Sequence, residues 1–195
     1  MSVVSNVVPI HDEQMISYPY GVIDSGYSCG WHTGVDLVPH GSTENYPLLY
    51  GCVASGTVVY TNYTDTGALG VQVQFQDDVT GLYWRYCHMQ VGSVSLSVGD
   101  HVDYNTIIGR MGATGNVTGR HLHLECSTSQ AWICDNFVNT CTELGIPNED
   151  DLVIEYGGTP PVPPTPTGRK SNWRNLFRKK YNIKFYWQKL KFTIK

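Results

Sequence analysis

Two histidines, His121 and His123, lie two positions apart in the stretch HLHLE, with Leu122 and Leu124 between and after them. This alternation is typical of a half-buried β-strand, in which successive side chains point to opposite faces. Imidazoles at positions i and i+2 lie about 6.6 Å apart on one face. That distance suits two nitrogens that bind one metal ion, or one bound nitrogen and one that faces the open position of the ion. A lone HxH pattern is more often two solvent-facing histidines on an edge strand, so a partner elsewhere must decide.

The stretch HTGVD supplies a candidate partner in His32 and Asp36. An imidazole nitrogen and a carboxylate oxygen are donors that Zn²⁺ accepts in proteins. On a regular strand the two residues would lie about 13 Å apart, too far to share one ion. We therefore expect His32 on a loop or bulge that leads into a strand. Gly30 and Gly34, which flank His32, favour such a bend.

A third element is His88, at the end of the aromatic stretch YWRYCH. Taken singly, a histidine such as His88 or His32 is more often a structural residue with satisfied hydrogen bonds. Three such features in one chain favour a metal site over coincidence. Their spacing alone does not say which histidines are ligands.

Strands and tight turns must position these side chains. In VQVQFQ, Val71, Val73 and Phe75 alternate with glutamines and should face the core. No convincing helix precedes residue 130, so we predict an all-β body with a mainly antiparallel sheet. The expected strands are rich in β-branched and aromatic residues and are bounded by Gly, Asn and Asp: Gly34–Val38, Leu48–Cys52, Gly56–Asn62, Gly70–Gln76, Leu82–His88 and Arg120–Cys126.

Charge and proline content divide the chain of 195 residues, whose 41% hydrophobic content allows one substantial core. All 17 acidic residues lie at or before Glu155, whereas ten of the 13 Lys and Arg lie at or after Arg169. The segment GGTPPVPPTPTG holds five of the ten prolines and is typical of a stiff polyproline II linker. We therefore divide the chain into an N-terminal extension (1–13), a body (14–156), a linker (157–168) and a basic aromatic tail (169–195).

The cysteines give no thiolate metal site, because none of the six falls in a CxxC pair. Cys134 and Cys141 are the best disulfide candidates by sequence proximity, and reduced core cysteines are at least as good an interpretation. The start MSVVSNVVPIHDEQ lacks the features of a signal peptide, and no apolar run is long enough to span a membrane. We therefore expect no transmembrane segment.

In this order, HTGVD, the Tyr-Cys-His at 86–88 and TGRHLHLE at 118–125 resemble the lysostaphin-type zinc endopeptidases, also called the LytM family. The resemblance covers roughly residues 14–127 and makes the body a zinc endopeptidase domain. Arg120 stands where the family usually has proline, which alters the edge of the site without touching a ligand.

The resemblance implies a role for each histidine of the motifs. It makes His32, Asp36 and His123 the ligands of Zn²⁺, and it places His88 and His121 beside the metal as catalytic groups. A catalytic zinc keeps three protein ligands and an open position. Hydrolysis of an amide also needs a group that stabilises the oxyanion and a proton for the leaving nitrogen, and the two further histidines can meet both needs. A tyrosine upstream of the first ligand often assists the oxyanion in the family, and Tyr27 is the nearest candidate.

The function that the resemblance implies is hydrolysis of peptide bonds in the cross-links or bridges of bacterial peptidoglycan. The alternative is a catalytically silent module of the same fold that binds the wall or assembles in a virion. Because its start lacks a signal peptide, the chain resembles phage-borne members of the family, and we expect it to act at the bacterial cell wall from a virion tail or after phage lysis. The alternative origin is a bacterium with non-standard export. The tail, 169–195, has ten positive charges and seven aromatic residues. We expect it to bind an anionic wall polymer or virion proteins rather than nucleic acid.

Overall fold

The computed structural model describes residues 2–41 and 46–158. The linker from Thr159 onward and the whole basic aromatic tail lie outside the described residues, so the sequence-based interpretations of both stay predictions. Among the described residues, no helix is long and apolar enough to cross a membrane.

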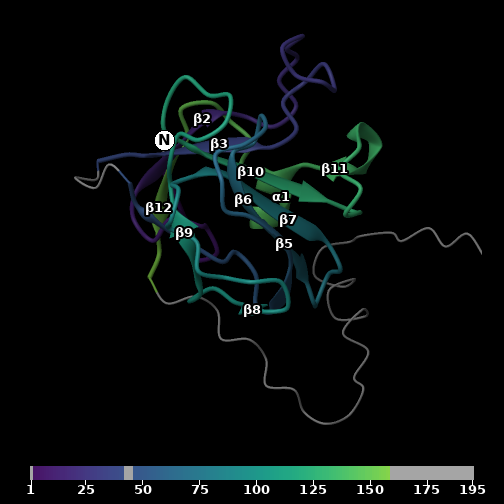
Figure 1. The fold of residues 1–195 in the computed structure, drawn as a ribbon. Coiled ribbons are helices and arrows are strands. Elements are labelled where there is room, and N and C mark those ends of the chain that lie inside the picture. The colour runs from purple at the N-terminus through teal and green to yellow at the C-terminus, as the bar shows by residue number, and fades with distance from the viewer. Residues whose placement is uncertain (1, 42–45, 159–195) are drawn as a thin grey trace, which may run out of the picture. The chain divides into compact units, whose positions relative to one another are not determined.

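One large sheet dominates the described part of the chain (Figure 1). Its strand order is β1-β12-β2-β3-β10-β7-β6-β5-β8, with β11 paired to β10, while β4 and β9 form a separate two-stranded sheet. Neighbouring strands are antiparallel except β1 and β12, which are parallel. The strands are β1 (Ser2–Ser5), β2 (Gln14–Tyr18), β3 (Val35–Pro39), β4 (Leu48–Tyr50), β5 (Gly56–Asn62), β6 (Val71–Asp77), β7 (Tyr83–Met89), β8 (His101–Val102), β9 (Ile107–Arg110), β10 (Leu122–Ser127), β11 (Phe137–Val138) and β12 (Val153–Tyr156).

The predicted all-β, mainly antiparallel architecture is confirmed. All six expected strands are present, with ends that differ from the prediction by at most two residues. Val71, Val73 and Phe75 are fully buried, as their alternation in the sequence predicted. Alternation works here because one face of β6 packs into the core.

The strand that carries HLHLE is buried on both faces, so the prediction of a half-buried strand was wrong. Strand β10 lies between β3 and β7 inside the sheet, and every residue from Leu122 to Ser127 is buried. Leu122 and Leu124 belong to the hydrophobic core. His123 and Glu125 face the other way and are covered by polar partners instead of water. The sequence pattern distinguishes the two faces but does not reveal what covers the polar one.

The helices that the structure describes are short and follow β10. A 3-10 helix spans Cys134–Asn136, and α1 spans Thr140–Leu144. The Asn139 side chain caps α1 by accepting from the amides of its first turn, and Gly145 ends it with a φ of 69°, in the left-handed region that favours glycine. Helix α1 contacts β10 and helps to bury that strand.

A disulfide joins Cys29 to Cys134, whose Cα atoms are 5.6 Å apart although 105 residues separate them in sequence. Cys134 is therefore paired with Cys29 and not with Cys141, its candidate partner by sequence proximity. Cys141 is buried within α1, whereas Cys134 is exposed in the 3-10 helix, so the two side chains have different surroundings. The remaining cysteines are free and buried, as reduced core cysteines would be: Cys52, Cys87, Cys126 and Cys141.

Candidate metal centre and catalytic histidines

His32 lies in a loop before β3, as its distance from Asp36 along the chain predicted. The chain folds back on itself there: the Gly21 amide donates to the His32 carbonyl at 2.8 Å, and the His32 amide donates to the Val22 carbonyl at 2.9 Å. We call residues 21–32 the site hairpin. His32 lies at its base, next to the sheet.

Gly34 brings the end of the site hairpin against β10. A β-carbon at Gly34 would lie only 2.4 Å from the Leu124 carbonyl oxygen and 3.0 Å from Cε1 of His123. Any larger residue would push this segment away from β10. The absence of a side chain at Gly34 therefore permits the approach of His32 to His123.

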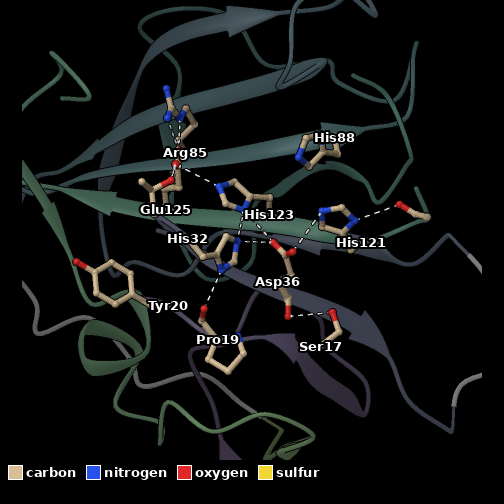
Figure 2. Close-up of polar contacts among 12 residues, drawn as sticks. Ser17, Pro19, Tyr20, His32, Asp36, Arg85, His88, His121, His123 and Glu125 are labelled. Atoms are coloured by element: carbon tan, nitrogen blue, oxygen red, sulfur yellow. Dashed lines mark hydrogen bonds and ion pairs between the residues drawn. The ribbon is translucent and has the colours of Figure 1, made fainter. Parts of the chain in front are cut away.

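Three side chains converge between β3 and β10 (Figure 2). The sheet register pairs His123 with Asp36 across the two strands. Nδ1 of His123 lies 2.8 Å from Oδ1 of Asp36, and Nε2 of His32 lies 3.2 Å from the same oxygen. The two nitrogens are 3.0 Å apart. Two imidazole nitrogens and a carboxylate oxygen gathered at one point are a donor set that suits a zinc ion.

His32 is oriented by the main chain. Its Nδ1 lies 2.8 Å from the Pro19 carbonyl oxygen. A carbonyl oxygen only accepts, so Nδ1 carries the hydrogen and Nε2 keeps its lone pair, directed at Asp36. The ring of His32 is fully buried, which fixes this direction.

His123 is oriented the opposite way, by Glu125. Its Nε2 lies 3.1 Å from Oε1 of Glu125, and donation to this carboxylate leaves Nδ1 as the nitrogen that faces Asp36. Burial alone would lower the pKa of His123, but Glu125 and Asp36 raise it to about 9. A metal ion that binds at Nδ1 therefore has to displace a proton.

Glu125 is held by partners from two other segments. It accepts from the Thr33 hydroxyl and from the Arg85 guanidinium, which reaches across from β7. Burial alone would raise the pKa of Glu125, but His123, Arg85 and Thr33 lower it to about 2. The carboxylate is thus ionised and fixed. The guanidinium of Arg85 also lies 4.1 Å from the centroid of the Trp132 ring, a cation–π contact that further holds it in place.

Asp36 lies at the centre of the cluster. Burial alone would raise the pKa of its carboxyl, but hydrogen bonds from His123 and His32 outweigh burial and hold that pKa well below its usual range. Its second oxygen, Oδ2, lies 3.7 Å from Nε2 of His121. Asp36 is therefore an anionic group in contact with three of the histidines.

His88 and His121 form a pair beside this cluster, with ring centroids 4.8 Å apart. Nδ1 of His88 donates to the Thr114 carbonyl at 2.8 Å, and Nδ1 of His121 donates to the Gly119 carbonyl at 3.1 Å. Both residues therefore keep Nε2 available. The close-up shows their rings on the other side of the Asp36 carboxylate from the ring of His32 (Figure 2).

His88 has an unusual backbone. Its φ is 60°, a left-handed conformation that is uncommon for a residue other than glycine. The register of β6 and β7 shifts nearby, between Val71 and Val73, and such a bulge re-aims a side chain. Burial, reinforced by the neighbouring His123, lowers the pKa of His88 to about 4, so this imidazole is neutral at pH 7.

Two tyrosines contact the ring of His32. The centroid of the Tyr27 ring lies 5.1 Å from it, and that of Tyr18 lies 4.8 Å from it. Burial and nearby carboxylates, Asp36 first among them, raise the pKa of Tyr27 to about 12, so its hydroxyl keeps its proton. Tyr27 is thus near the metal-site cluster, where the sequence suggested an oxyanion group.

Sequence reasoning missed most of the supporting residues. Glu125 could have been found, because position i+2 from His123 extends the same face of the strand. The contacts of Pro19, Thr33 and Arg85 with the site depend on tertiary packing, and no local pattern marks them. Tyr18 also went unnoticed as a neighbour of His32.

In this all-β body, two histidines and an aspartate converge beside strands β3 and β10, and two further histidines lie next to them. This arrangement has the features of a metal-dependent peptidase. Residues 30–133 match the family model of peptidase family M23. The chain belongs to peptidase family M23, and the resemblance to lysostaphin-type peptidases is confirmed.

Known relatives are similar to this chain over part of their length. Lysostaphin from Staphylococcus simulans is 29% identical over 157 residues, 80% of this chain and 29% of lysostaphin. Glycyl-glycine endopeptidase ALE-1 from Staphylococcus capitis is 29% identical over 112 residues, 57% of this chain and 29% of that protein. The chain therefore spans less than a third of the length of these relatives. The solved catalytic domain of Staphylococcus simulans lysostaphin aligns with a TM-score of 0.54 and 25% identity, over 69% of this chain and 92% of that domain.

Proposed function

We propose that the chain is a zinc peptidase and that His32, Asp36 and His123 hold the ion. The observation that carries this proposal is the convergence of Nε2 of His32, Oδ1 of Asp36 and Nδ1 of His123, with each imidazole oriented toward this point by a hydrogen bond at its other ring nitrogen. Three N and O donors fit a catalytic zinc, which needs a further open position. Structural zinc sites, in contrast, are usually closed by four protein ligands.

A bound zinc ion would supply Lewis acidity and an open position at which water is activated. The remaining chemistry falls to this chain's own side chains. Neutral His88 offers Nε2 as an acceptor, and His121 offers Nε2 on the same side of Asp36. Together they can take a proton from water and return one to the leaving nitrogen. Tyr27, which keeps its hydroxyl proton, is the candidate donor to the oxyanion.

We infer that the substrate is a peptide of bacterial peptidoglycan, in a cross-link or an interpeptide bridge. Membership of peptidase family M23 and similarity to lysostaphin and to a glycyl-glycine endopeptidase support this substrate class. The site of action would then be the bacterial cell wall. The expected phage association, in a virion tail or during lysis, stays a prediction.

The test uses purified protein and cell walls that differ in cross-bridge type. The zinc-loaded protein should release muropeptides, whose masses identify the bond that is cut, and a chelator should abolish the release until zinc is restored. The alternative function, a silent wall-binding or virion module, predicts binding to the walls without release of muropeptides at any zinc concentration. No release from any wall type would therefore favour the alternative.

A further inference from the structure

The disulfide lies at the edge of the candidate site. Cys29 belongs to the site hairpin, two residues after Tyr27 and three before His32. Cys134 opens the 3-10 helix that follows β10. Cys29 is half-buried and Cys134 is exposed, so a reductant in solution can reach the bond.

The Cys134 end of the disulfide is attached to the strand that carries His123. Just after the 3-10 helix, β11 pairs with the last two residues of β10. The Thr128 amide also donates to the Asn136 carbonyl at 2.9 Å, which closes the intervening loop. The disulfide therefore links the site hairpin to the far end of β10.

The base and the turn of the site hairpin are held differently. At the base, His32 is fully buried and bonds to Pro19. Nearer the turn the backbone bonds within the hairpin itself, from the Asp24 amide to the Gly30 carbonyl at 3.1 Å, and Ile23 is 83% exposed. Within the described residues, the hairpin pairs with no strand of the large sheet.

Aromatic contacts add to the disulfide on the same side. Trp31 meets Phe137 of β11 edge-on, with ring centroids 6.0 Å apart, and Tyr20 meets Trp31 at 5.2 Å. Near the turn, Tyr27 contacts Tyr18 at 6.2 Å. The disulfide is the covalent member of this set, and its Cys29 lies two residues after Tyr27.

We propose that Cys29 and Cys134 are positioning residues, whose disulfide holds the turn of the site hairpin, and with it Tyr27, in place over His32. This inference rests on the proposed peptidase function. It makes turnover dependent on the oxidised disulfide, because loss of the bond frees the turn but leaves the three proposed metal ligands in place: His32 at the buried base, Asp36 on β3 and His123 on β10. The chain would then work fully only where disulfides persist, as outside a cell.

The experiment compares oxidised protein, protein reduced with a water-soluble phosphine, and the double variant Cys29→Ser/Cys134→Ser. The phosphine breaks the Sγ–Sγ bond to leave two thiols and itself becomes the phosphine oxide, taking its oxygen from water. Zinc content, kcat and KM on soluble muropeptides, and hydrogen exchange are measured at a temperature where near-UV circular dichroism shows all forms folded. The double variant is the matched control for effects of the phosphine itself.

We expect the reduced protein and the double variant to keep one zinc per chain while kcat falls about tenfold or more, since small displacements of positioning groups cost rates of this order. The Tyr27 and Gly30 amides, which bond within the turn, should exchange faster, whereas amides of β3 should not. Reoxidation should restore kcat in the wild-type chain only, and phosphine should not affect the double variant further.

A purely structural disulfide gives a different result: the melting temperature falls on reduction while kcat stays within about twofold. That result overturns the proposal, as does a reduced chain that is unfolded at every temperature tested. If the oxidised protein hydrolyses no muropeptide, the proposed function fails instead. Zinc content and hydrogen exchange still test the hairpin in that case, because neither readout depends on turnover.

Discussion

The ring nitrogen that each imidazole directs toward Asp36 decides what that histidine can do in the site. His32 presents Nε2 because Pro19 occupies Nδ1, and His123 presents Nδ1 because Glu125 occupies Nε2. The two rings therefore approach Asp36 through chemically different nitrogens. Residue type alone predicts a histidine ligand, but the partner of the other nitrogen selects the donor atom.

Removal of one proposed ligand should abolish metal binding. In His123→Ala the donor set falls to His32 and Asp36, which is too few for a zinc site of ordinary affinity. Metal analysis after dialysis should find far less than one zinc per chain. His101→Ala, which changes an exposed histidine of β8, is the matched control and should bind zinc as the wild type does. Undiminished zinc in His123→Ala would refute the ligand assignment.

The paired histidines should behave differently from the ligands. His88→Ala and His121→Ala should each retain zinc but lose hydrolysis by roughly 10²-fold or more, the size expected for an acid–base or oxyanion group. Zinc analysis and muropeptide release on the same preparations separate the two effects. If His121→Ala loses zinc as readily as His123→Ala, both histidines of HLHLE are ligands.

Glu125 should matter to metal affinity although it is not a proposed ligand. Glu125→Gln keeps an oxygen for His123 but removes the ion pair with Arg85, whose side chain is only 12% exposed. We expect zinc affinity to fall about 10- to 100-fold, as for other residues that orient a ligand. Competition with a fluorescent chelator measures this change, and Glu155→Gln, at an exposed position of β12, provides the control. Equal affinities in the two variants would contradict the orienting role.

At the scale of elements, zinc binding should require the segment before β3 to pack closely against β10. Gly34→Ala places a β-carbon against the Leu124 carbonyl, and relief of such a contact in a packed region costs roughly 1–3 kcal/mol. We expect a lower melting temperature and weaker zinc binding. Gly119→Ala is the control, because a β-carbon there meets open space. Similar losses in both variants would mean that steric contact at Gly34 is not the cause.

The strands were predictable because alternation is a local property of the sequence. VQVQFQ and HLHLE each revealed a strand and its two faces, and the glycines around His32 indicated a bend. The sequence did not reveal the disulfide partner of Cys134 or the contact between Arg85 and Glu125. Both depend on which distant strands become neighbours, and the burial of β10 on its polar face depends on the same packing.

At the scale of the whole molecule, an acidic body precedes a basic tail. We propose that residues 169–195 target or anchor the peptidase, and truncation after Thr167 tests the proposal. Hydrolysis of soluble muropeptides should persist, because every proposed site residue lies before the linker. Co-sedimentation with intact walls should fall, and wall binding by the full chain should weaken as salt is raised. Wall binding and virion incorporation that are both unchanged after truncation would leave the tail without an anchoring role.

The buried cysteines have a consequence for the durability of the single disulfide. Burial raises the pKa of the free thiols of Cys52, Cys87, Cys126 and Cys141. Disulfide scrambling needs a thiolate that attacks an existing bond. In the folded chain these thiols stay protonated and enclosed, so none of them can exchange with the accessible bond between Cys29 and Cys134. A protein with six cysteines can thus keep one pairing at its surface, because the thiols that could exchange with it are buried in the hydrophobic core.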